Sequence, residues 1–286
     1  MKLEFAGDTH VGMKRDHNED ALLILPEENL FVVADGMGGH ASGEVASKLA
    51  VDTIREFFLD TAQDEEITWP FRSEHEDDYN ANRLTTSIKL ANLRIFESAS
   101  ADLSNRGMGT TVVSCFATDD KLYVGHVGDS RAYLKRGNEL TQLTEDHSLL
   151  NDFRRSLNLT PEEEENFPHK NIIVRALGMK DNVEVDLSVF TPQSGDTYLL
   201  CSDGLTGELS DGEISLILAE EVSLVKACHR LVKLGNDNGG RDNITVIVLR
   251  FLDENYPGAD ALTEEVTREI TDDVTELEQP FSEGEE

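Results

Sequence analysis

Predicted strands occur in consecutive runs and predicted helices occur in pairs, and this order limits the possible folds more than any other feature. Short segments rich in Val, Ile, Leu and aromatic residues, most ending near Gly, Asp or Asn, predict strands. These span 22–25, 30–34, 111–117, 121–127, 131–135, 183–190, 197–201 and 244–251. Apolar residues at helical spacing predict helices at 42–58, 82–103, 149–157, 211–219 and 224–234. A doubly wound sheet would alternate strand and helix, so the order favours an α+β fold of layered antiparallel sheets.

The two longest predicted helices each carry one apolar stripe, which is typical of a helix that covers a sheet. In 42–58 the stripe consists of Val45, Leu49, Ile54, Phe57 and Phe58. In 82–103 it consists of Leu84, Ile88, Ala91, Leu93, Ile95 and Phe96. Both helices are therefore expected to pack on the sheets through these residues.

The composition is that of a folded protein without a membrane span. Of the 286 residues, 38% are hydrophobic, and no apolar run approaches the roughly 20 residues of a membrane helix. The N-terminal stretch MKLEFAGDTH lacks the apolar segment of a signal peptide. The cysteines Cys115, Cys201 and Cys228 lie among apolar residues without zinc spacing, and we interpret them as small buried thiols. Together these features predict a cytoplasmic protein that does not engage a membrane.

The formal charge of −32 argues against a nucleic-acid partner, which would require basic patches. Part of the acidic excess lies in 257–286, which contains 11 acidic residues and one basic residue. Apolar periodicity stops after Phe251, so the chain is predicted to consist of one folded domain over 1–252 and an acidic, disordered tail over 253–286. Alternatively, the threonines of the tail are phosphorylated and recognised by a partner.

The stretch FVVADGMGGHA (31–41) is compatible with two kinds of site. A strand, a glycine-rich turn and a helix can hold a phosphate, and Gly36 to Ala41 fit the G-x-G-x-x-A pattern of dinucleotide folds. However, Asp35 would place a carboxylate where a pyrophosphate must approach, and the strand order is not that of a dinucleotide fold. The glycines can instead leave room for a metal ion beside Asp35.

Acidic residues beside Gly, Ser or Asn recur where predicted strands begin or end. They are Glu19, Asp20, Asp35, Asp129, Asp203 and Asp242. Any one of them could be an ordinary turn residue, but the strands of a sheet can bring all of them to one cleft. Converging carboxylates repel each other unless cations lie between them, and oxygen-only ligands suit Mg²⁺ or Mn²⁺. Arg15, four residues before Glu19, is a candidate anchor for phosphate oxygens.

Six motifs in this order and spacing resemble those of the metal-dependent protein phosphatase (PPM) family, the type 2C serine/threonine phosphatases, and in particular their bacterial branch. The motifs are RDHNED (15–20), DGMGGH (35–40), MGTT (108–111), GDSR (128–131), CSDGL (201–205) and DNITV (242–246). The resemblance covers about residues 1–252. It implies a β-sandwich of two antiparallel sheets flanked by pairs of helices, a four-layer αββα architecture.

The resemblance also implies roles for individual residues. Asp35 would bridge two ions, with Glu19 and the carbonyl of Gly36 on one of them and Asp203 and Asp242 on the other. Asp129 would join Asp203 at a third, weaker site. Asp20 and Asn243 would stand behind the ligands, with Asp20 holding metal-bound water. Arg15 would bind the substrate phosphate.

The implied reaction is hydrolysis of phosphoserine or phosphothreonine by a hydroxide that bridges two Mn²⁺ or Mg²⁺ ions. It attacks phosphorus in line with the leaving oxygen, while the metals and Arg15 neutralise the phosphoryl oxygens. Two positions depart from the family pattern. Met37 stands where many eukaryotic members have a histidine proposed as the acid for the leaving group, and Gly207 stands where many members have an aspartate that helps to hold the third ion.

The sequence thus predicts a hydrolase that opposes Ser/Thr protein kinases in bacterial signal transduction. Its expected partners are phosphorylated proteins, including a Ser/Thr kinase and its substrates. The alternative is a catalytically weak phosphoprotein-binding regulator on the same fold, which loss of metal ligands would favour, and none is lost.

Overall fold

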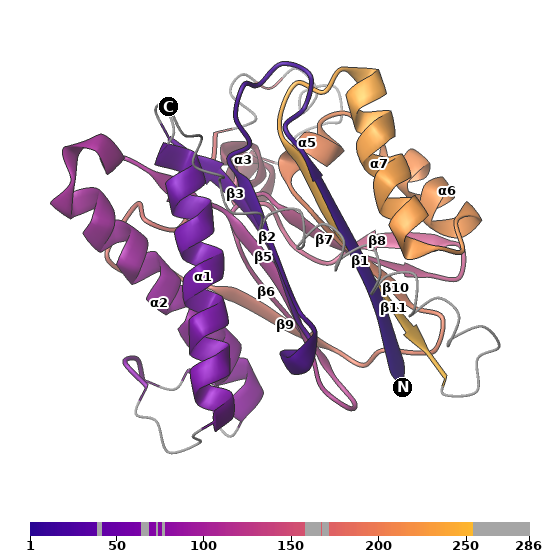
Figure 1. The fold of residues 1–286 in the computed structure, drawn as a ribbon, viewed down its shortest axis with the longest axis horizontal. Coiled ribbons are helices and arrows are strands. Elements are labelled where there is room, and N and C mark those ends of the chain that lie inside the picture. Colours follow the sequence, from indigo (N-terminus) through magenta and orange to yellow (C-terminus); the bar gives the residue numbers. More distant parts are fainter. Residues whose placement is uncertain are drawn as a thin grey trace, which may run out of the picture.

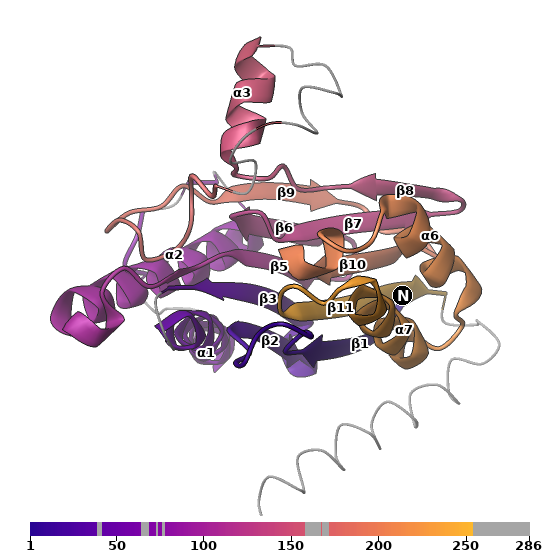
Figure 2. The same ribbon diagram turned by 90° about the horizontal axis from the view of Figure 1, so that it is seen from above.

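Two antiparallel β-sheets pack face to face, and a pair of helices covers the outer face of each sheet (Figures 1 and 2). The computed structural model describes residues 1–38, 42–63, 69–72, 74–75, 78–157, 167 and 172–253. The order of layers is helix, sheet, sheet, helix. This confirms the α+β class predicted from the strand runs and helix pairs, and the αββα sandwich implied by the family resemblance.

The first sheet has strand order β2-β3-β5-β6-β9, with the short β4 paired to β3. The strands are β2 (Asp20–Leu25), β3 (Leu30–Met37), β4 (Gly109–Thr110), β5 (Val112–Ala117), β6 (Leu122–Val127) and β9 (Asp186–Phe190). The helices on its outer face are α1 (Ser42–Gln63) and α2 (Tyr79–Ala101), with short 3₁₀ turns η1 (Pro26–Glu28) and η2 (Leu103–Asn105) nearby. Asp78 caps α2 by accepting the Ala81 amide, and Phe58, Leu84 and Ile88 are buried between the helices and the sheet.

The second sheet has strand order β1-β11-β10-β7-β8. The strands are β1 (Lys2–His10), β7 (Arg131–Arg136), β8 (Glu139–Gln142), β10 (Thr197–Cys201) and β11 (Ile244–Leu252). The helices on this side are α5 (Asp203–Thr206), α6 (Asp211–Glu220) and α7 (Leu224–Asn238). Ser210 and Glu213 form a capping box that starts α6. Between the two sheets, Phe31, Tyr198 and Leu249 are fully buried and join the layers.

Several sequence predictions of local structure were wrong. Strands β1 and β8 and the four-residue helix α5 were not predicted. The two strands lie at the edges of their sheet, where polar residues weaken the apolar alternation. Strand β9 begins at Asp186 rather than at 183. Val45 is 41% exposed, although it was assigned to the apolar stripe of α1. The helix instead faces the sheet with Ala46 and Ala50, whose small side chains allow close packing.

The interpretation of the cysteines is confirmed, since all three are free and buried. Helix α3 (Leu149–Leu157) stands away from the sandwich (Figure 2). It begins the segment between Ser148 and Ile173, two residues joined by an isolated β-bridge, and we call this segment the flap. In the part of the chain that the structure describes, no helix combines the length and apolarity needed to cross a membrane. The acidic tail from 254 onward lies outside the described residues, so its disorder stays a prediction.

Candidate metal and phosphate site

The acidic residues named from the sequence meet where strands of both sheets begin or end. Asp20 and Asp35 are directly paired across β2 and β3. Asp203 opens α5 immediately after β10, and Asp129 lies in the turn between β6 and β7. Asp242 comes two residues before β11, so the strand ends of the two sheets bring these side chains together.

Asn243 joins the segments that carry the candidate ligands. Its Oδ1 accepts the amide of Glu19 at 2.8 Å. Its Nδ2 donates to the carbonyls of Val11 at 2.8 Å and His17 at 2.9 Å. The buried Asn243 side chain therefore holds the loop between β1 and β2, which carries Arg15, against the segment that carries Asp242.

Glycines allow the backbone of the DGMGGH motif to approach the Glu19 segment. The Gly36 amide donates to the Glu19 carbonyl at 3.1 Å, and a Cβ at Gly36 would lie only 2.2 Å from the Gly43 oxygen. A Cβ at Gly43 would lie 2.7 Å from the carboxyl carbon of Glu19. Because the Gly43 amide also hydrogen-bonds to Glu19, the N-terminal turn of α1 cradles a carboxylate rather than a phosphate.

Burial and mutual repulsion raise the pKa values of these acids. The pKa of Asp35 lies well above its ordinary value because the carboxyl is desolvated and faces Asp20 and Asp203. Burial, with Asp203 and Asp242 nearby, raises the pKa of Asp20 to about 7. Burial and the charge of Asp203 raise the pKa of Asp129 to about 7. A cluster of this kind needs positive charge to stay ionised at neutral pH.

The donor set fits hard divalent cations. Among the described residues, one carboxylate oxygen of Asp20 and one of Asp129, Oδ1 in each case, are buried without a hydrogen-bond partner. Asp203 hydrogen-bonds with Asp35, and desolvation and Asp242 raise the pKa of Asp203 as well. An all-oxygen set of converging carboxylates is the kind that Mg²⁺ and Mn²⁺ prefer.

Arg15 lies at the rim of this acidic cluster. Its Nη2 is 2.6 Å from Oδ2 of Asp242, and both side chains are partly exposed to solvent. The charges of Glu19 and Asp35 also act on the guanidinium. A phosphate group that reaches the carboxylate cluster would therefore pass within the reach of Arg15.

A cleft of about 500 Å³ extends from the cluster toward the flap. It is lined by Asp129, Arg131, Asp146, Asp203, Gly207 and Asp242, among others. Gly207 has ordinary helical dihedrals, φ −71° and ψ −20°. The position at which the family carries a further aspartate therefore faces the cleft in this chain too, but without a carboxylate.

Sequence reasoning missed three side chains that support the cluster. Ser202 donates from Oγ to Oδ2 of Asp20 at 2.8 Å. Thr111 accepts the Asp35 amide at 3.2 Å through Oγ1. Asp146 accepts from Nη2 of Arg131 at 2.7 Å. Ser202 and Thr111 lie within the quoted motifs, and Ser202 is next to a candidate ligand in the sequence, so they could have been predicted to support the cluster. Asp146 lies in none of the motifs, and no sequence feature pointed to it.

Met37 takes no part in the cluster through hydrogen bonds. It ends β3 and pairs with Gly109 of β4. The side chain is a thioether without a titratable proton, so it cannot serve as the acid that the family histidine is proposed to supply.

Comparisons with known proteins agree with this geometry. A family model described as protein phosphatase 2C matches residues 6–245. The serine/threonine phosphatase Stp of Listeria welshimeri is 38% identical over 256 residues, which cover 87% of this chain and 95% of that protein. The protein phosphatase PhpP of Streptococcus pneumoniae is 36% identical over 253 residues, covering 86% of this chain and 97% of that protein.

Solved structures give the same result. The catalytic domain of the serine/threonine protein phosphatase PstP, in complex with two manganese ions, is 34% identical with a TM-score of 0.74, and the match covers 88% of this chain and 99% of that one. The chain therefore belongs to the protein phosphatase 2C family, as its six motifs indicated.

Proposed function

We propose that this chain is a metal-dependent protein serine/threonine phosphatase that hydrolyses phosphoserine and phosphothreonine in proteins. The observation that carries the proposal is the convergence of four carboxylates, Glu19, Asp35, Asp203 and Asp242, beside the guanidinium of Arg15. Family membership and the names of the relatives support the same activity.

Glu19, Asp35, the carbonyl of Gly36, Asp203 and Asp242 would hold two Mn²⁺ or Mg²⁺ ions, and Asp129 would contribute to a weaker third site. The manganese-bound structure of the PstP catalytic domain supports this choice of metal. When bound, such ions lower the pKa of coordinated water and draw negative charge from phosphoryl oxygens.

The side chains of the chain itself would orient the substrate and the ligands. Arg15 would pair with two phosphoryl oxygens through its planar guanidinium, which places the phosphorus over the carboxylate cluster. Asn243 fixes the position of the Glu19 amide and of the loop that carries Arg15 through its hydrogen bonds. Oδ2 of Asp20 accepts from Ser202, and its buried Oδ1 has no hydrogen-bond partner among the residues that the structure describes, so Asp20 would be able to hold a water molecule.

The biological setting forms part of the proposal. We infer that the protein acts in the bacterial cytoplasm, where it opposes a Ser/Thr kinase by dephosphorylating the kinase or its substrates. The bacterial relatives named serine/threonine phosphatase Stp and protein phosphatase PhpP support phosphoproteins as the substrate class. A non-catalytic regulator is disfavoured because every carboxylate named as a core ligand is present and converges on one site.

The direct test is phosphate release from a phosphothreonine peptide by the purified full-length chain with Mn²⁺, with Mg²⁺ and with EDTA. The expected result is turnover that depends on the added metal and is abolished in Arg15→Ala at low substrate concentration. Equal phosphate release with EDTA and with Mn²⁺, or none under any condition, would contradict the proposed function.

A further inference from the structure

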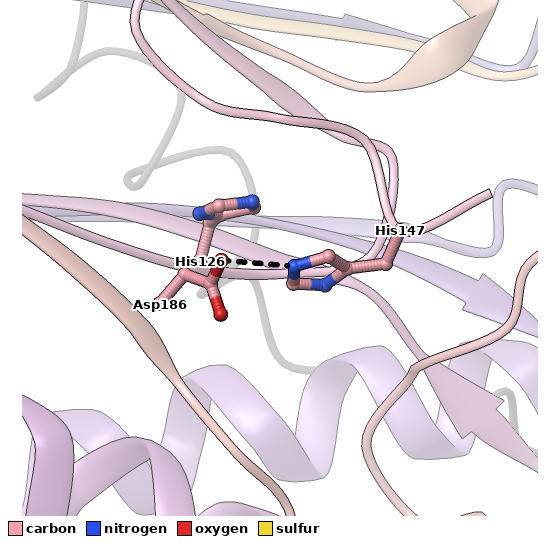
Figure 3. Close-up of side chains that lie close together, drawn as sticks. All are labelled: His126, His147 and Asp186. Atoms are coloured by element: carbon pink, nitrogen blue, oxygen red, sulfur yellow. Dashed lines mark ion pairs between the residues drawn. The ribbon is translucent and has the colours of Figure 1, made fainter. Parts of the chain in front are cut away.

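A second cluster of titratable side chains lies beside the cleft, beneath the flap. His126 of β6, His147 and Asp186 of β9 lie close together, as Figure 3 shows, with candidate ligand atoms within 4.8 Å of one another. The two imidazole rings stack at 4.7 Å between centroids with 20° between their planes. Both histidines are buried. Two histidines and a carboxylate have the composition of a transition-metal site.

The hydrogen bonds of His147 argue against a metal at this cluster. Its Nδ1 accepts the Gly128 amide at 3.0 Å, so in the neutral ring the proton must reside on Nε2. Nε2 is the atom that faces Oδ2 of Asp186, at 3.3 Å. A metal needs the lone pair of that nitrogen, and freeing it would force a proton onto Nδ1, against the Gly128 amide. Burial, with the adjacent His126, lowers the pKa of His147 to about 4, consistent with a neutral ring.

Instead, the contacts of His147 are directed to the turn that carries Asp129. The Gly128 amide donates to Nδ1 of His147, and the His147 amide donates in return to the Gly128 carbonyl at 2.8 Å. Gly128 has φ +115°, and a Cβ there would lie 2.5 Å from Cβ of Thr111. The reciprocal pair of hydrogen bonds therefore holds a backbone conformation that few residues adopt, one position before Asp129.

The far side of the same turn is tied to the Asp35 strand. Ser130 and Thr111 share a hydrogen bond between their hydroxyl oxygens at 2.7 Å. Thr111 in turn donates its amide to the Asp35 carbonyl at 2.8 Å. Asp129 thus lies between two anchored residues. It is 8% exposed, and its Oδ1 has no hydrogen-bond partner among the described residues.

His147 also lies where the chain enters the flap, and it contacts the chain where it leaves the flap. Its carbonyl accepts the amide of Val174 at 2.9 Å, where the chain returns from the flap. Its ring stacks on His126, whose Nε2 donates to the Glu145 carbonyl at 2.9 Å. The residue therefore connects the chain segments that enter and leave the flap to the Asp129 turn.

We propose that His147 is a positioning residue, which through Nδ1 sets the Gly128–Asp129 turn so that the Asp129 carboxylate faces the cleft as a cation ligand. The inference rests on the proposed function, because it assigns His147 to the weakest of the metal sites proposed there. The proposal predicts that cation binding at Asp129 depends on the hydrogen-bond acceptor at Nδ1 of His147. It should not depend on the charge of the ring or on its contact with Asp186.

Two substitutions separate these contributions. His147→Asn keeps an acceptor where Nδ1 lies but loses the Asp186 contact, whereas His147→Gln keeps a polar group near Nε2 and loses the acceptor for Gly128. Mn²⁺ binding to the full-length variants is measured by calorimetry, and thermal unfolding is recorded for each. We expect His147→Gln to weaken the weakest Mn²⁺ site about tenfold and His147→Asn to leave it close to wild type, since residues behind a ligand typically contribute that much.

Asp129→Asn is the matched control, which should abolish the weakest site and leave the tighter sites intact. The inference is overturned if His147→Gln and His147→Asn weaken Mn²⁺ binding equally, or if the wild-type protein binds only two Mn²⁺ ions. A wild-type protein without Mn²⁺-dependent phosphate release would instead count against the proposed function, so the two failures are distinguishable.

A spectroscopic measurement keeps the inference testable even if the variants fold poorly. Long-range ¹H–¹⁵N spectra of the wild-type protein report which ring nitrogen of His147 carries the proton. We expect a proton on Nε2 and an unprotonated, hydrogen-bonded Nδ1, unchanged by added Zn²⁺. A proton on Nδ1, or a shift of the ring signals on binding Zn²⁺, would overturn the positioning role and favour a metal at the histidine cluster.

Discussion

Carboxylates at two places in the sandwich show the difference between a structural acid and a functional one. Asp196 immediately precedes β10 and is 1% exposed. Its carboxylate accepts from Nε of Arg136 at 2.8 Å, from Nη2 of Arg136 at 2.6 Å and from the Gln193 amide at 2.8 Å. Asp35 is surrounded by other carboxylates that raise its pKa. The protein satisfies Asp196 with its own donors and leaves the Asp35 cluster to be satisfied by cations.

Asp35→Asn should have the largest effect on catalysis. The substitution removes the carboxylate proposed to bridge both ions, so kcat with saturating Mn²⁺ should fall on the order of 1,000-fold. In metal-free protein at pH 8 the same change should raise the melting temperature, because it removes one charge from a repelling cluster. Activity on p-nitrophenyl phosphate and thermal unfolding in EDTA check the two parts. If kcat and the melting temperature both fall, Asp35 has a structural role like that of Asp196.

Asp196→Asn should give the opposite pattern. Asparagine replaces one acceptor oxygen with a donor that faces Arg136 or the Gln193 amide, which should cost about 1–3 kcal/mol of unfolding free energy. Urea unfolding measures this cost. The kcat on p-nitrophenyl phosphate should stay near that of the wild type, and a large loss of kcat in a folded variant would remove the distinction between the two kinds of acid.

The pH dependence of stability should differ between metal-free and Mn²⁺-bound protein. In metal-free protein the pKa values of Asp20 and Asp129 are raised to about 7, so the folded state holds protons that the unfolded state releases above pH 4 or so. Stability contributed by these groups is therefore complete below about pH 4 and is lost as the pH rises toward 7. Urea unfolding in EDTA at pH 5 and pH 7.5 should show this fall. Mn²⁺ should stabilise the protein more at pH 7.5 than at pH 5, and equal stabilisation at both values would contradict it.

Gly207→Asp should strengthen the weakest cation site. Gly207 has helical dihedrals and its position lines the cleft beside Asp129 and Asp203. Within the described residues, a Cβ there would meet the Asp203 carbonyl alone, at 3.2 Å. An added carboxylate should tighten the weakest Mn²⁺ site by about tenfold, within the range of one ligand or its support. Calorimetry with Gly207→Asn as the uncharged control tests this. Equal tightening by both variants would assign the effect to packing rather than charge.

Removal of the acidic tail should have the smallest effect. The last strand, β11, ends at Leu252, so a chain that stops at Tyr256 retains every residue of the described site. Its kcat and KM on p-nitrophenyl phosphate should match those of the full chain. A large loss in this assay would place part of the catalytic fold within 257–286.

The sequence predicted the architecture better than it predicted local structure. Strand runs and helix pairs indicated layered antiparallel sheets, and the family resemblance supplied the αββα order of the layers. Strongly apolar strands such as 197–201 were predicted with their correct bounds. Edge strands β1 and β8 were missed because β1 buries a single residue and β8 buries none, so their side chains need not alternate. Val45 was wrongly predicted to face the sheet, because periodicity alone does not show which of two neighbouring rows of residues on a helix packs against the sheet.

By itself, the sequence determined that this chain is a layered α+β protein of the type 2C family and which acids it offers to a metal, since motif spacing and residue chemistry are local properties of the chain. Only the tertiary structure decided how those acids meet and what supports them. The contacts of Asn243 with Glu19, and of His147 with Gly128, join residues that are far apart in the sequence or on separate elements. Such contacts depend on where strands end in space, a consequence of packing two sheets together that no single segment encodes.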